Sequence, residues 1–489
     1  MNRRVLLLSA GALMALTLLA YAPALRNGFI WDDDDHVTRN PNIVVSDGLH
    51  HIWTSMSASR YYPLTLTVWW CENALWDLQP MPYHAVNILL HTGSAVLLFF
   101  LLRRLRVPGA WVAAALWALH PVNVESVAWI TEMKNTLSCV FFLLTLHCWL
   151  QFDEKRENKW YSLALFTFAA ALLSKPSTVP LPAVLLLYMW WRHGRLRWAD
   201  VGRVVPLFVM ALGMSLLAVK EQLLNAALEG SAEWHLSLAS RLIVAGKALW
   251  FYAGALLWPV PLSFIYPRWQ IQPHQFTQWG AFIGTLVICS VLLAYRKRLW
   301  ARAILLGSGY FALMLAPVLG LANVYFFRYS FVSDHFCYLA SIGLIALATA
   351  AVARAVTSRQ MQVALAAAGI LAFGALTWQR IPVFRNDAAL WRDTLEKNPD
   401  AAIAHNNLGN IYRRRGLFAE AEAHYREALR LTPNYPEVYN NLGIALAELK
   451  RWDEAEKAFA TAIQLRPTFA DAHDNLDHLH QLQKPPAAP

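Results

Sequence analysis

Four consecutive carboxylates stand directly after Trp31, close behind the first long apolar segment. They are Asp32, Asp33, Asp34 and Asp35. Tryptophan anchors segments at membrane interfaces, where partial burial and mutual repulsion raise the pKa of at least one carboxyl group. A raised pKa suits proton abstraction, and clustered carboxylates also suit a divalent cation. The run therefore predicts a general base or, at Asp34 and Asp35, a metal site. A solvated acidic turn is the structural alternative.

More polar and ionisable side chains stand at one predicted end of other apolar segments. They are His120, Glu125, Glu132, Lys134, Lys175, Arg328, Asp334, His335 and Tyr338. Such groups are costly beside a membrane and usually face a cavity or pair with each other. A carboxylate base beside several cations fits transfer from a phosphate-linked donor, because the cations hold the leaving phosphate while the base activates a hydroxyl. Each residue alone is better explained by pairing at a helix end, whereas their common side favours a catalytic site.

Long apolar segments must position these residues. The chain has 489 residues, of which 57% are hydrophobic and 15% charged, whereas soluble chains carry about a quarter charged residues. Segments of roughly 20 apolar residues predict an all-α, polytopic membrane domain over residues 1–380, with about eleven spans. The predicted spans lie near residues 5–25, 84–102, 110–130, 136–151, 160–174, 178–191, 204–219, 276–295, 302–321, 336–354 and 362–380.

Basic clusters between the spans give the predicted orientation. Residues 103–106, 192–197 and 296–298 carry arginine and lysine, which favour cytoplasmic loops. Because these loops hold much of the basic charge behind the net +10, no nucleic-acid partner is expected. With all three loops inside, the apolar segment 242–258 cannot cross the membrane fully, so we predict that it is re-entrant or interfacial.

This orientation predicts two long external segments, at residues 26–83 and 220–278. The first contains the acidic run and a segment, Arg60 to Trp76, that mixes tyrosine and tryptophan with polar residues. We predict an amphipathic helix there, lying on the outer surface with Glu72 toward the headgroups. Eleven spans leave everything after Arg380 outside the cytoplasm.

A 34-residue period begins at Ala402 and predicts a tetratricopeptide domain over residues 386–483. Its two units share small residues, aromatic residues and a closing proline, at Leu408, Gly409, Tyr412, Ala421, Tyr425, Ala428 and Pro433 and at Leu442, Gly443, Leu446, Ala455, Phe459, Ala462 and Pro467. The array offers a surface for a partner protein or braces the membrane domain. Candidate surface residues are Asn406, Asn407, Asn410, Asn440 and Asn441. Residues 484–489 are predicted to be a disordered tail.

Six strings along the chain carry a family resemblance. In order they are residues 28–33 (GFIWDD), 61–65 (YYPLT), 84–91 (HAVNILLH), 119–127 (LHPVNVESV), 173–176 (LSKP) and 334–339 (DHFCYL). With the repeats that follow, they make the chain similar to the multispanning protein O-mannosyltransferases with C-terminal tetratricopeptide repeats. That family falls within the GT-C type of glycosyltransferases, which use polyprenyl-phosphate sugars.

The resemblance implies inverting transfer of a hexose, mannose by the family's name, from a polyprenyl-phosphate sugar to an acceptor protein or envelope glycan. It implies an integral protein of a bacterial inner membrane, in contact with membrane lipids, with its repeats in the periplasm. The implied base lies in the first external loop, at Asp33 before Asp32. The implied ligands of the donor phosphate are Lys175, Lys134, Arg328 and His335. The residues implied to support the pocket are His120, Glu125, Asp334, Tyr338 and His91.

The chain departs from the family pattern in a few places, and two other functions stay open. Arginine is usual in relatives where this chain has His335, an acidic residue is common at Asn135 and a basic one at Met133. These changes affect the expected phosphate contacts. The other functions are a membrane-anchored repeat scaffold without catalysis and a transporter of lipid-linked glycans. The spans show no evident inverted repeat, which argues against the transporter.

Overall fold

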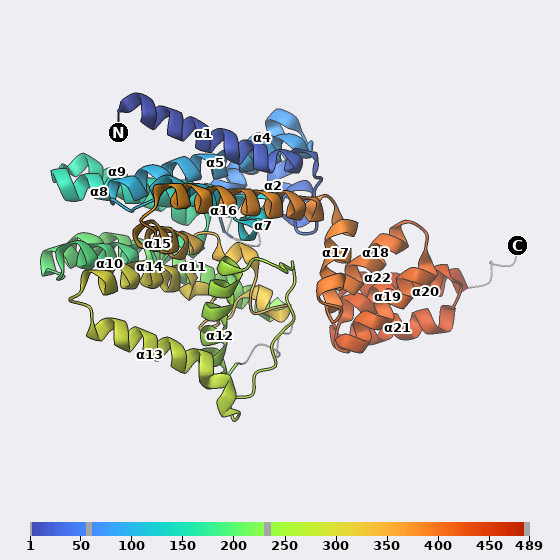
Figure 1. The fold of residues 1–489 in the computed structure, drawn as a ribbon. Coiled ribbons are helices and arrows are strands. Elements are labelled where there is room, and N and C mark those ends of the chain that lie inside the picture. The colour runs from blue at the N-terminus through green and yellow to red at the C-terminus, as the bar shows by residue number, and fades with distance from the viewer. Residues whose placement is uncertain (1, 55–60, 229–235, 484–489) are drawn as a thin grey trace, which may run out of the picture.

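The computed structural model describes residues 2–54, 61–228 and 236–483, with the backbone alone for residues 221–228. These residues form helices and loops without β-strands. Figure 1 shows a bundle of long helices, with a compact array of shorter helices at one end. The principal bundle helices are α1 (Arg3–Tyr21), α4 (Pro63–Trp76), α5 (Pro80–Arg104), α6 (Ala110–Ala118), α8 (Met133–Lys155), α9 (Asn158–Ser174), α10 (Leu181–His193), α11 (Trp198–Leu228), α12 (Leu238–Leu257), α13 (Gly280–Ala294), α14 (Leu299–Leu315), α15 (Ser341–Ala355) and α16 (Arg359–Arg380).

Within the described residues, eight helices are long and apolar enough to cross a membrane. They cover Arg3–Arg26, Pro80–Arg104, Ile130–Lys155, Trp198–Lys220, Leu238–Leu257, Phe276–Ala294, Leu299–Val318 and Arg359–Phe384. Seven of them match predicted spans, and the other contains the segment predicted to be re-entrant or interfacial. The predicted spans at 160–174, 178–191 and 336–354 correspond to the shorter helices α9, α10 and α15.

The span predicted over residues 110–130 is not one continuous helix. Helix α6 ends at Ala118, and a 3-10 turn at Pro121–Asn123 and the short helix α7 (Val124–Ala128) follow it. Proline lacks a backbone N–H and clashes with the preceding turn, so the helix cannot continue through Pro121. The break places His120 just before the 3-10 turn and Glu125 in the short helix α7, where Ser333 and His335 contact its carboxylate.

Helix α12 runs steeply across the long helices of the bundle instead of along them, as Figure 1 shows. Its C-terminal turn contacts the break after α6, because the Nε2 atom of His120 lies 3.1 Å from the carbonyl oxygen of Leu256. Whether this helix crosses the membrane or stays within one leaflet remains a prediction.

Helix α4 differs from the amphipathic surface helix that the sequence predicts. It begins at Pro63, but its polar residue Glu72 is only 3% exposed and points into the protein with Trp69. Burial raises the pKa of Glu72 to about 9. Glu72 therefore does not face lipid headgroups. Arg60, the first residue of the predicted segment, lies outside the described part of the chain.

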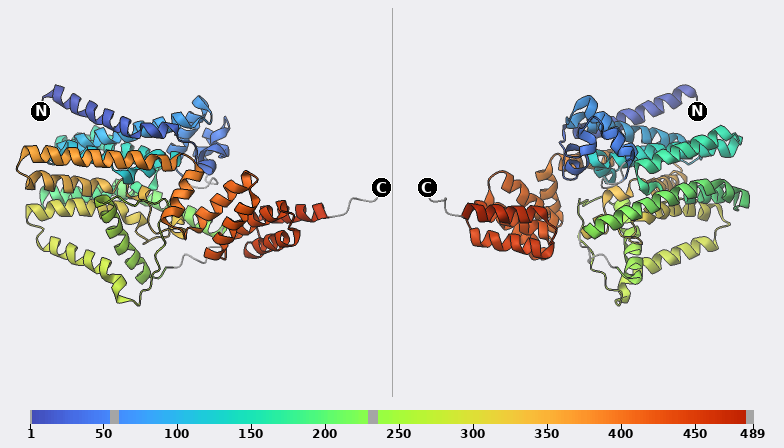
Figure 2. Two further views of the ribbon diagram at one scale, coloured as in Figure 1. Left: turned by 45° about the vertical axis from the view of Figure 1, so that its right-hand side comes forward. Right: turned by 180° about the vertical axis from the view of Figure 1, so that it is seen from behind.

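The C-terminal array consists of stacked helix pairs that project from one end of the bundle (Figure 2). Its helices are α17 (Asp387–Lys397), α18 (Ala402–Arg414), α19 (Phe418–Leu431), α20 (Pro436–Glu448), α21 (Trp452–Leu465) and α22 (Ala470–Gln483). A Cβ atom on Gly409 would lie 2.5 Å from the ring of Tyr425, and one on Gly443 would lie 2.6 Å from Phe459. Glycine is thus required where the two helices of each repeat cross. The predicted tail, 484–489, lies outside the described residues.

The array is joined to the bundle by buried and polar contacts. Trp391 of α17 is 1% exposed and belongs to the same apolar core as the bundle helices. The guanidinium of Arg380, at the end of α16, donates to Asp393 over 2.6 Å. The amide of Asn398 donates to the carbonyl oxygen of Ile265 over 3.2 Å. These contacts give the short array the neighbours that a solenoid needs at its first face.

Candidate active site

Asp33 is fully buried and fixes the loop after α1 to the helix break that precedes α8. One carboxylate oxygen accepts hydrogen bonds from the backbone N–H and the hydroxyl of Thr131, over 2.7 and 2.5 Å. The other accepts from the backbone N–H of Ile30 over 2.8 Å. Burial raises the pKa of Asp33 to about 7, against the effect of these hydrogen bonds, and the charge of Asp32 adds to the rise. Both carboxylate oxygens of Asp33 thus accept hydrogen bonds from the protein itself.

Asp32 lies beside Asp33 but keeps part of its side chain accessible, with 22% exposed. One of its oxygens is 4.0 Å from Nε2 of His36. The ring of His36 lies 6.3 Å from Tyr62, whose ring in turn carries the ammonium of Lys134 at 5.7 Å. His36 and Tyr62 thus connect Asp32 to the lysine-containing cluster described below.

The last two carboxylates of the run face a surface arginine. Asp34 accepts from Thr38 over 2.9 Å and pairs with Arg39 over 2.8 Å, and Asp35 lies 3.9 Å from the same guanidinium. Across residues 2–54, 61–228 and 236–483, no three histidine, cysteine or acidic side chains are grouped so that they could hold a metal ion. Asp34 and Asp35 thus form an ion-paired turn in this structure.

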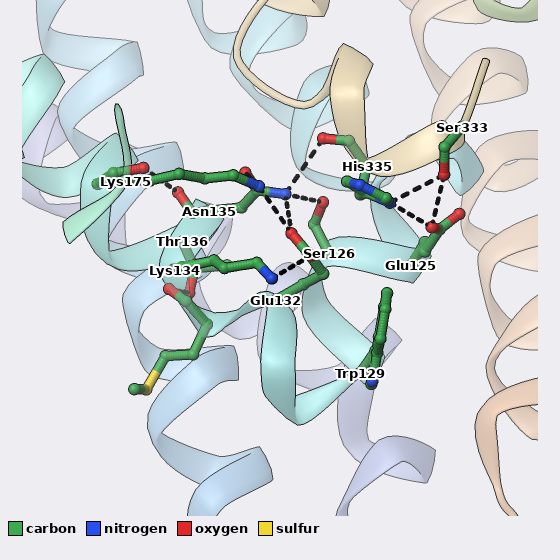
Figure 3. A network of polar contacts seen from close by, with 12 residues as sticks. Glu125, Ser126, Trp129, Glu132, Lys134, Asn135, Thr136, Lys175, Ser333 and His335 are labelled. Atoms are coloured by element: carbon green, nitrogen blue, oxygen red, sulfur yellow. Dashed lines mark hydrogen bonds and ion pairs between the residues drawn. The ribbon is translucent and has the colours of Figure 1, made fainter. Parts of the chain in front are cut away.

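Glu132 is the centre of a buried polar cluster at the start of α8, drawn in Figure 3. One carboxylate oxygen lies 3.0 Å from the ammonium of Lys134, and the other lies 2.9 Å from that of Lys175. The second oxygen also accepts from the amide of Asn135 over 2.7 Å, and Lys175 donates to the oxygen of that amide over 2.7 Å. The side chains of all four residues are at most 15% exposed.

This cluster, named here the Glu132 cluster and comprising Glu132, Lys134, Asn135 and Lys175, carries one carboxylate and two ammonium groups. Burial and the neighbouring Lys134 lower the pKa of Lys175 to about 8, while Glu132 raises it. An ammonium has three N–H bonds, and Lys175 uses two of them on Glu132 and Asn135. A buried centre with excess positive charge is suited to an anion such as a phosphate.

A second polar group, formed by Glu125, Ser333 and His335, lies beside the Glu132 cluster (Figure 3). One oxygen of Glu125 is 2.5 Å from Nδ1 of His335 and accepts from the hydroxyl of Ser333 over 2.9 Å. The backbone oxygen of His335 accepts from the amide of Asn135 over 3.1 Å, which joins the two groups. Glu125 thus fixes the imidazole by one nitrogen, as carboxylates do beside functional histidines.

The remaining predicted pocket residues support the backbone around these groups. His91 lies 2.6 Å from the hydroxyl of Tyr338 and 2.9 Å from the carbonyl oxygen of Ala118, in the core. Asp334 accepts from the hydroxyl of Tyr266 over 2.7 Å, and burial raises its pKa to about 8. These contacts hold the segment that carries Ser333 and His335.

Arg328, another predicted phosphate ligand, lies among tyrosine side chains. Its guanidinium donates to the hydroxyl of Tyr325 over 3.1 Å and stacks 5.2 Å from the ring of Tyr329. It also lies 5.9 Å from the ring of Tyr435 in the repeat array. The structure therefore brings Lys134, Lys175 and His335 together and places Arg328 at the joint with the repeats.

Sequence reasoning missed the central role of Glu132 and the contribution of Thr131 and Ser333. Glu132 stands two residues before Lys134 at the end of a broken helix, and that spacing was the available signal. Thr131 acts partly through its backbone N–H, which no side-chain pattern reveals.

The asparagines predicted to line a partner surface mostly bridge neighbouring helices. The amide of Asn441 donates to Asn406 over 3.0 Å, and that of Asn475 donates to Asn440 over 2.9 Å. Asn410 accepts from the hydroxyl of Tyr425 over 2.8 Å. The two bonds between asparagines tie the first helices of successive repeats together, and the bond from Tyr425 joins the two helices of one repeat. The partner surface remains a prediction.

Residues 73–220 match the family model described as dolichyl-phosphate-mannose-protein mannosyltransferase. Residues 409–450 match a TPR repeat model, and residues 436–469 match a tetratricopeptide repeat model. The chain thus combines a membrane domain similar to mannosyltransferases with tetratricopeptide repeats. The fold class predicted from the sequence, an all-α membrane domain followed by repeats, is confirmed.

Two curated relatives match most of the chain. The chain is 26% identical over 435 residues to protein O-mannosyl-transferase F38B6.6 of Caenorhabditis elegans, which covers 84% of this chain and 61% of that protein. It is 26% identical over 480 residues to protein O-mannosyl-transferase TMTC4 of Homo sapiens, covering 82% of this chain and 63% of that protein. The chain therefore spans less than two thirds of these relatives. The resemblance inferred from the sequence strings is confirmed.

A solved structure also aligns with the chain. It is the crystal structure of ArnT from Cupriavidus metallidurans bound to undecaprenyl phosphate, with 15% sequence identity and a TM-score of 0.37. The alignment covers 92% of this chain and 79% of that one.

Proposed function

We propose that this protein is an integral membrane glycosyltransferase that moves a hexose, mannose by its relatives' names, from a polyprenyl-phosphate donor to a protein hydroxyl outside the cytoplasm. The carrying observation is the buried Glu132 cluster, with its two ammonium groups, next to the acidic loop that holds Asp32. The match of residues 73–220 to dolichyl-phosphate-mannose-protein mannosyltransferases supports this donor class, because dolichyl phosphate is a polyprenyl phosphate.

Lys134 and Lys175 are the proposed ligands of the donor phosphate. Glu132 holds both ammonium groups within 3.0 Å of its carboxylate, and their excess charge fits the phosphate that departs with the lipid. His335 is a third proposed contact, since Glu125 binds its Nδ1 atom and leaves Nε2 for another partner. Positive groups that are already in place stabilise the charge that develops on the leaving phosphate.

Asp32 is the proposed base, with Asp33 as a positioning residue. Both oxygens of Asp33 accept hydrogen bonds from the protein, and its side chain is 0% exposed. Asp32 keeps accessible surface, so an acceptor hydroxyl can reach it. Its carboxylate removes the hydroxyl proton as the oxygen attacks the anomeric carbon. The bond from that carbon to the phosphate oxygen breaks, and the anomeric configuration inverts.

The repeat array is proposed to present the acceptor, on the extracytoplasmic face of a bacterial inner membrane. Asp387 of α17 accepts from the backbone N–H of Trp31 over 2.8 Å, directly beside the acidic loop. The first repeat helices therefore start next to the proposed base. A protein held along the array enters the site from that side.

The test is transfer by the purified full chain from a radiolabelled polyprenyl-phosphate mannose to peptides that contain serine and threonine. Asp32→Asn is expected to lower kcat at least about a hundredfold, since general base catalysis contributes about 10²–10⁴-fold. Asp35→Asn, on the exposed side of the same loop, is the matched control and keeps its activity. Full activity of Asp32→Asn would show that another residue is the base.

The same assay separates the proposed activity from the scaffold alternative. If no polyprenyl-phosphate hexose is consumed with any acceptor, and Asp32→Asn complements a deletion strain as well as the wild type does, the scaffold is favoured. Equal unfolding temperatures of the wild type and both variants are the control for folding.

A further inference from the structure

The half of the bundle remote from the repeat array contains a cavity. Its volume is about 190 Å³, and it lies between α5, α8, α10, α14 and α15. Its walls are almost entirely apolar, with leucine, alanine, valine and aromatic side chains that include Trp149 and Trp191. Apolar walls of this kind suit a hydrocarbon chain and not a sugar, because they offer few partners for hydroxyl groups.

Two arginines also line this cavity, Arg106 after α5 and Arg354 in the last turn of α15. The segments that carry them pack together, because a Cβ atom on Gly109 would lie 3.0 Å from Thr349 and 3.7 Å from Ala353. Arg106 also adopts a φ of 57°, in the left-handed region. Glycine is the usual residue there, so the turn itself does not require arginine.

These two guanidinium groups differ from other cations at the same end of the bundle. Arg104 pairs with Glu154 over 2.7 Å, and Arg192 lies 3.3 Å from Asp153. Within the part of the chain that the structure describes, neither Arg106 nor Arg354 has an acidic partner, and both are exposed. The entrance of an apolar cavity thus carries two uncompensated positive charges.

We propose that this cavity binds one anionic phospholipid of the cytoplasmic leaflet, with an acyl chain inside and the phosphate between Arg106 and Arg354. The basic loops at this end predict that it faces the cytoplasm. The donor phosphate belongs to the opposite end, because the cavity begins at Leu143 of α8, nine residues after Lys134 and about 14 Å along the helix. This lipid site is independent of the proposed transferase activity.

The test counts bound lipids by native mass spectrometry of the full chain in detergent. Dioleoyl phosphatidylglycerol is the anionic probe, and dioleoyl phosphatidylcholine is the neutral one. One phosphatidylglycerol is expected to bind in preference, by about fivefold for each arginine. The variant Arg106→Gln/Arg354→Gln loses this preference. Arg359→Gln, an exposed arginine at the start of α16 that does not line the cavity, keeps it.

The acyl chain is tested separately from the headgroup. Ala346→Phe fills the cavity and should reduce phosphatidylglycerol binding although both arginines remain. Dihexanoyl phosphatidylglycerol, with short chains, should bind the wild type more weakly than the dioleoyl lipid, which needs no variant to fold. Equal binding of the two headgroups by the wild type would overturn the proposal. So would equal losses in Arg359→Gln and the double variant, or equal binding of short and long chains.

Discussion

The bundle and the repeat array differ in how exposed their paired charged side chains are. In the bundle, Glu132 is 2% exposed and shares its carboxylate between two lysines. In the array, Arg430 pairs with Glu427 over 2.6 Å, but the side chains are 64% and 37% exposed. Exposed pairs add little to stability. Buried charges are expensive, and unequal numbers of them are more so.

This difference indicates that the charged side chains of the Glu132 cluster reduce the stability of the bundle. Folding alone would be served as well by apolar residues at the Glu132 cluster, since such replacements are often neutral or stabilising. The array instead follows folding rules throughout, with glycines at its helix crossings and charges at its surface. A ligand for the excess positive charge is therefore expected in the bundle and not at the ion pairs of the array.

The largest expected effect comes from Lys175→Met. It removes one ammonium from the Glu132 cluster and leaves Lys134 to pair with Glu132, so the chain should still fold. We expect kcat/KM for the polyprenyl-phosphate donor to fall at least about a hundredfold, as when one stabilising group is removed from a transition state. Lys457→Met, on the exposed face of α21, is the control. A loss of similar size in that control would contradict the contrast between the two regions.

A smaller effect is expected from Gly443→Val in the array. The new side chain meets the ring of Phe459, 2.6 Å from the Cβ position, and overpacking of this kind costs about 1–3 kcal/mol. Limited proteolysis of the full chain should show faster cleavage of the repeats. Gly374→Ala in α16 is the control, because nothing lies within 4 Å of its Cβ position. Unchanged cleavage would show that the crossing has room.

A pH effect should appear in the bundle. The pKa of Lys175 is lowered to about 8, so the side chain is charged at pH 7 and loses its proton as the pH rises through 8. The KM for the donor is therefore expected to increase several-fold between pH 7 and pH 9. In Lys175→Arg, the guanidinium stays charged, and that increase should vanish. An identical rise in both proteins would assign it to another group.

The smallest effect is expected from Arg430→Ala. Its partner Glu427 is on the surface of α19, where water replaces the ion pair. The unfolding temperature and the donor KM should both stay at the wild-type values, as measured by differential scanning fluorimetry and the transfer assay. A large shift in either would mean that the array's surface charges matter more than their exposure indicates.

Much of the architecture could be predicted from the sequence, because periodicity and hydropathy are properties of whole segments. The repeat glycines and the long spans followed from such patterns. The break after α6 also follows from the sequence, because a helix cannot continue through Pro121. The prediction for Glu72, that it faces lipid headgroups, was wrong. Its neighbours in sequence suggest an interface, but the packing of α4 against the first loop turns it inward.

The site was predicted only in part, because it depends on which side chains meet across long sequence separations. Lys134, Lys175 and His335 do converge, through Glu132 and Asn135. Arg328 contacts aromatic rings, including that of Tyr435 in the array, and its role at the site stays a prediction. The choice between Asp32 and Asp33 required burial and the backbone N–H donors of Ile30 and Thr131. Neither is encoded in a motif.

The hydrogen bond from the backbone N–H of Trp31 to Asp387 and the ion pair between Arg380 and Asp393 join the repeats to the bundle at two points. Under the proposed function, the array sets the distance from a docked segment of the acceptor protein to the anomeric carbon of the sugar. Hydroxyls would be selected by their spacing from the docked segment more than by the residues that flank them, and lengthening that spacing would move the modification along the acceptor.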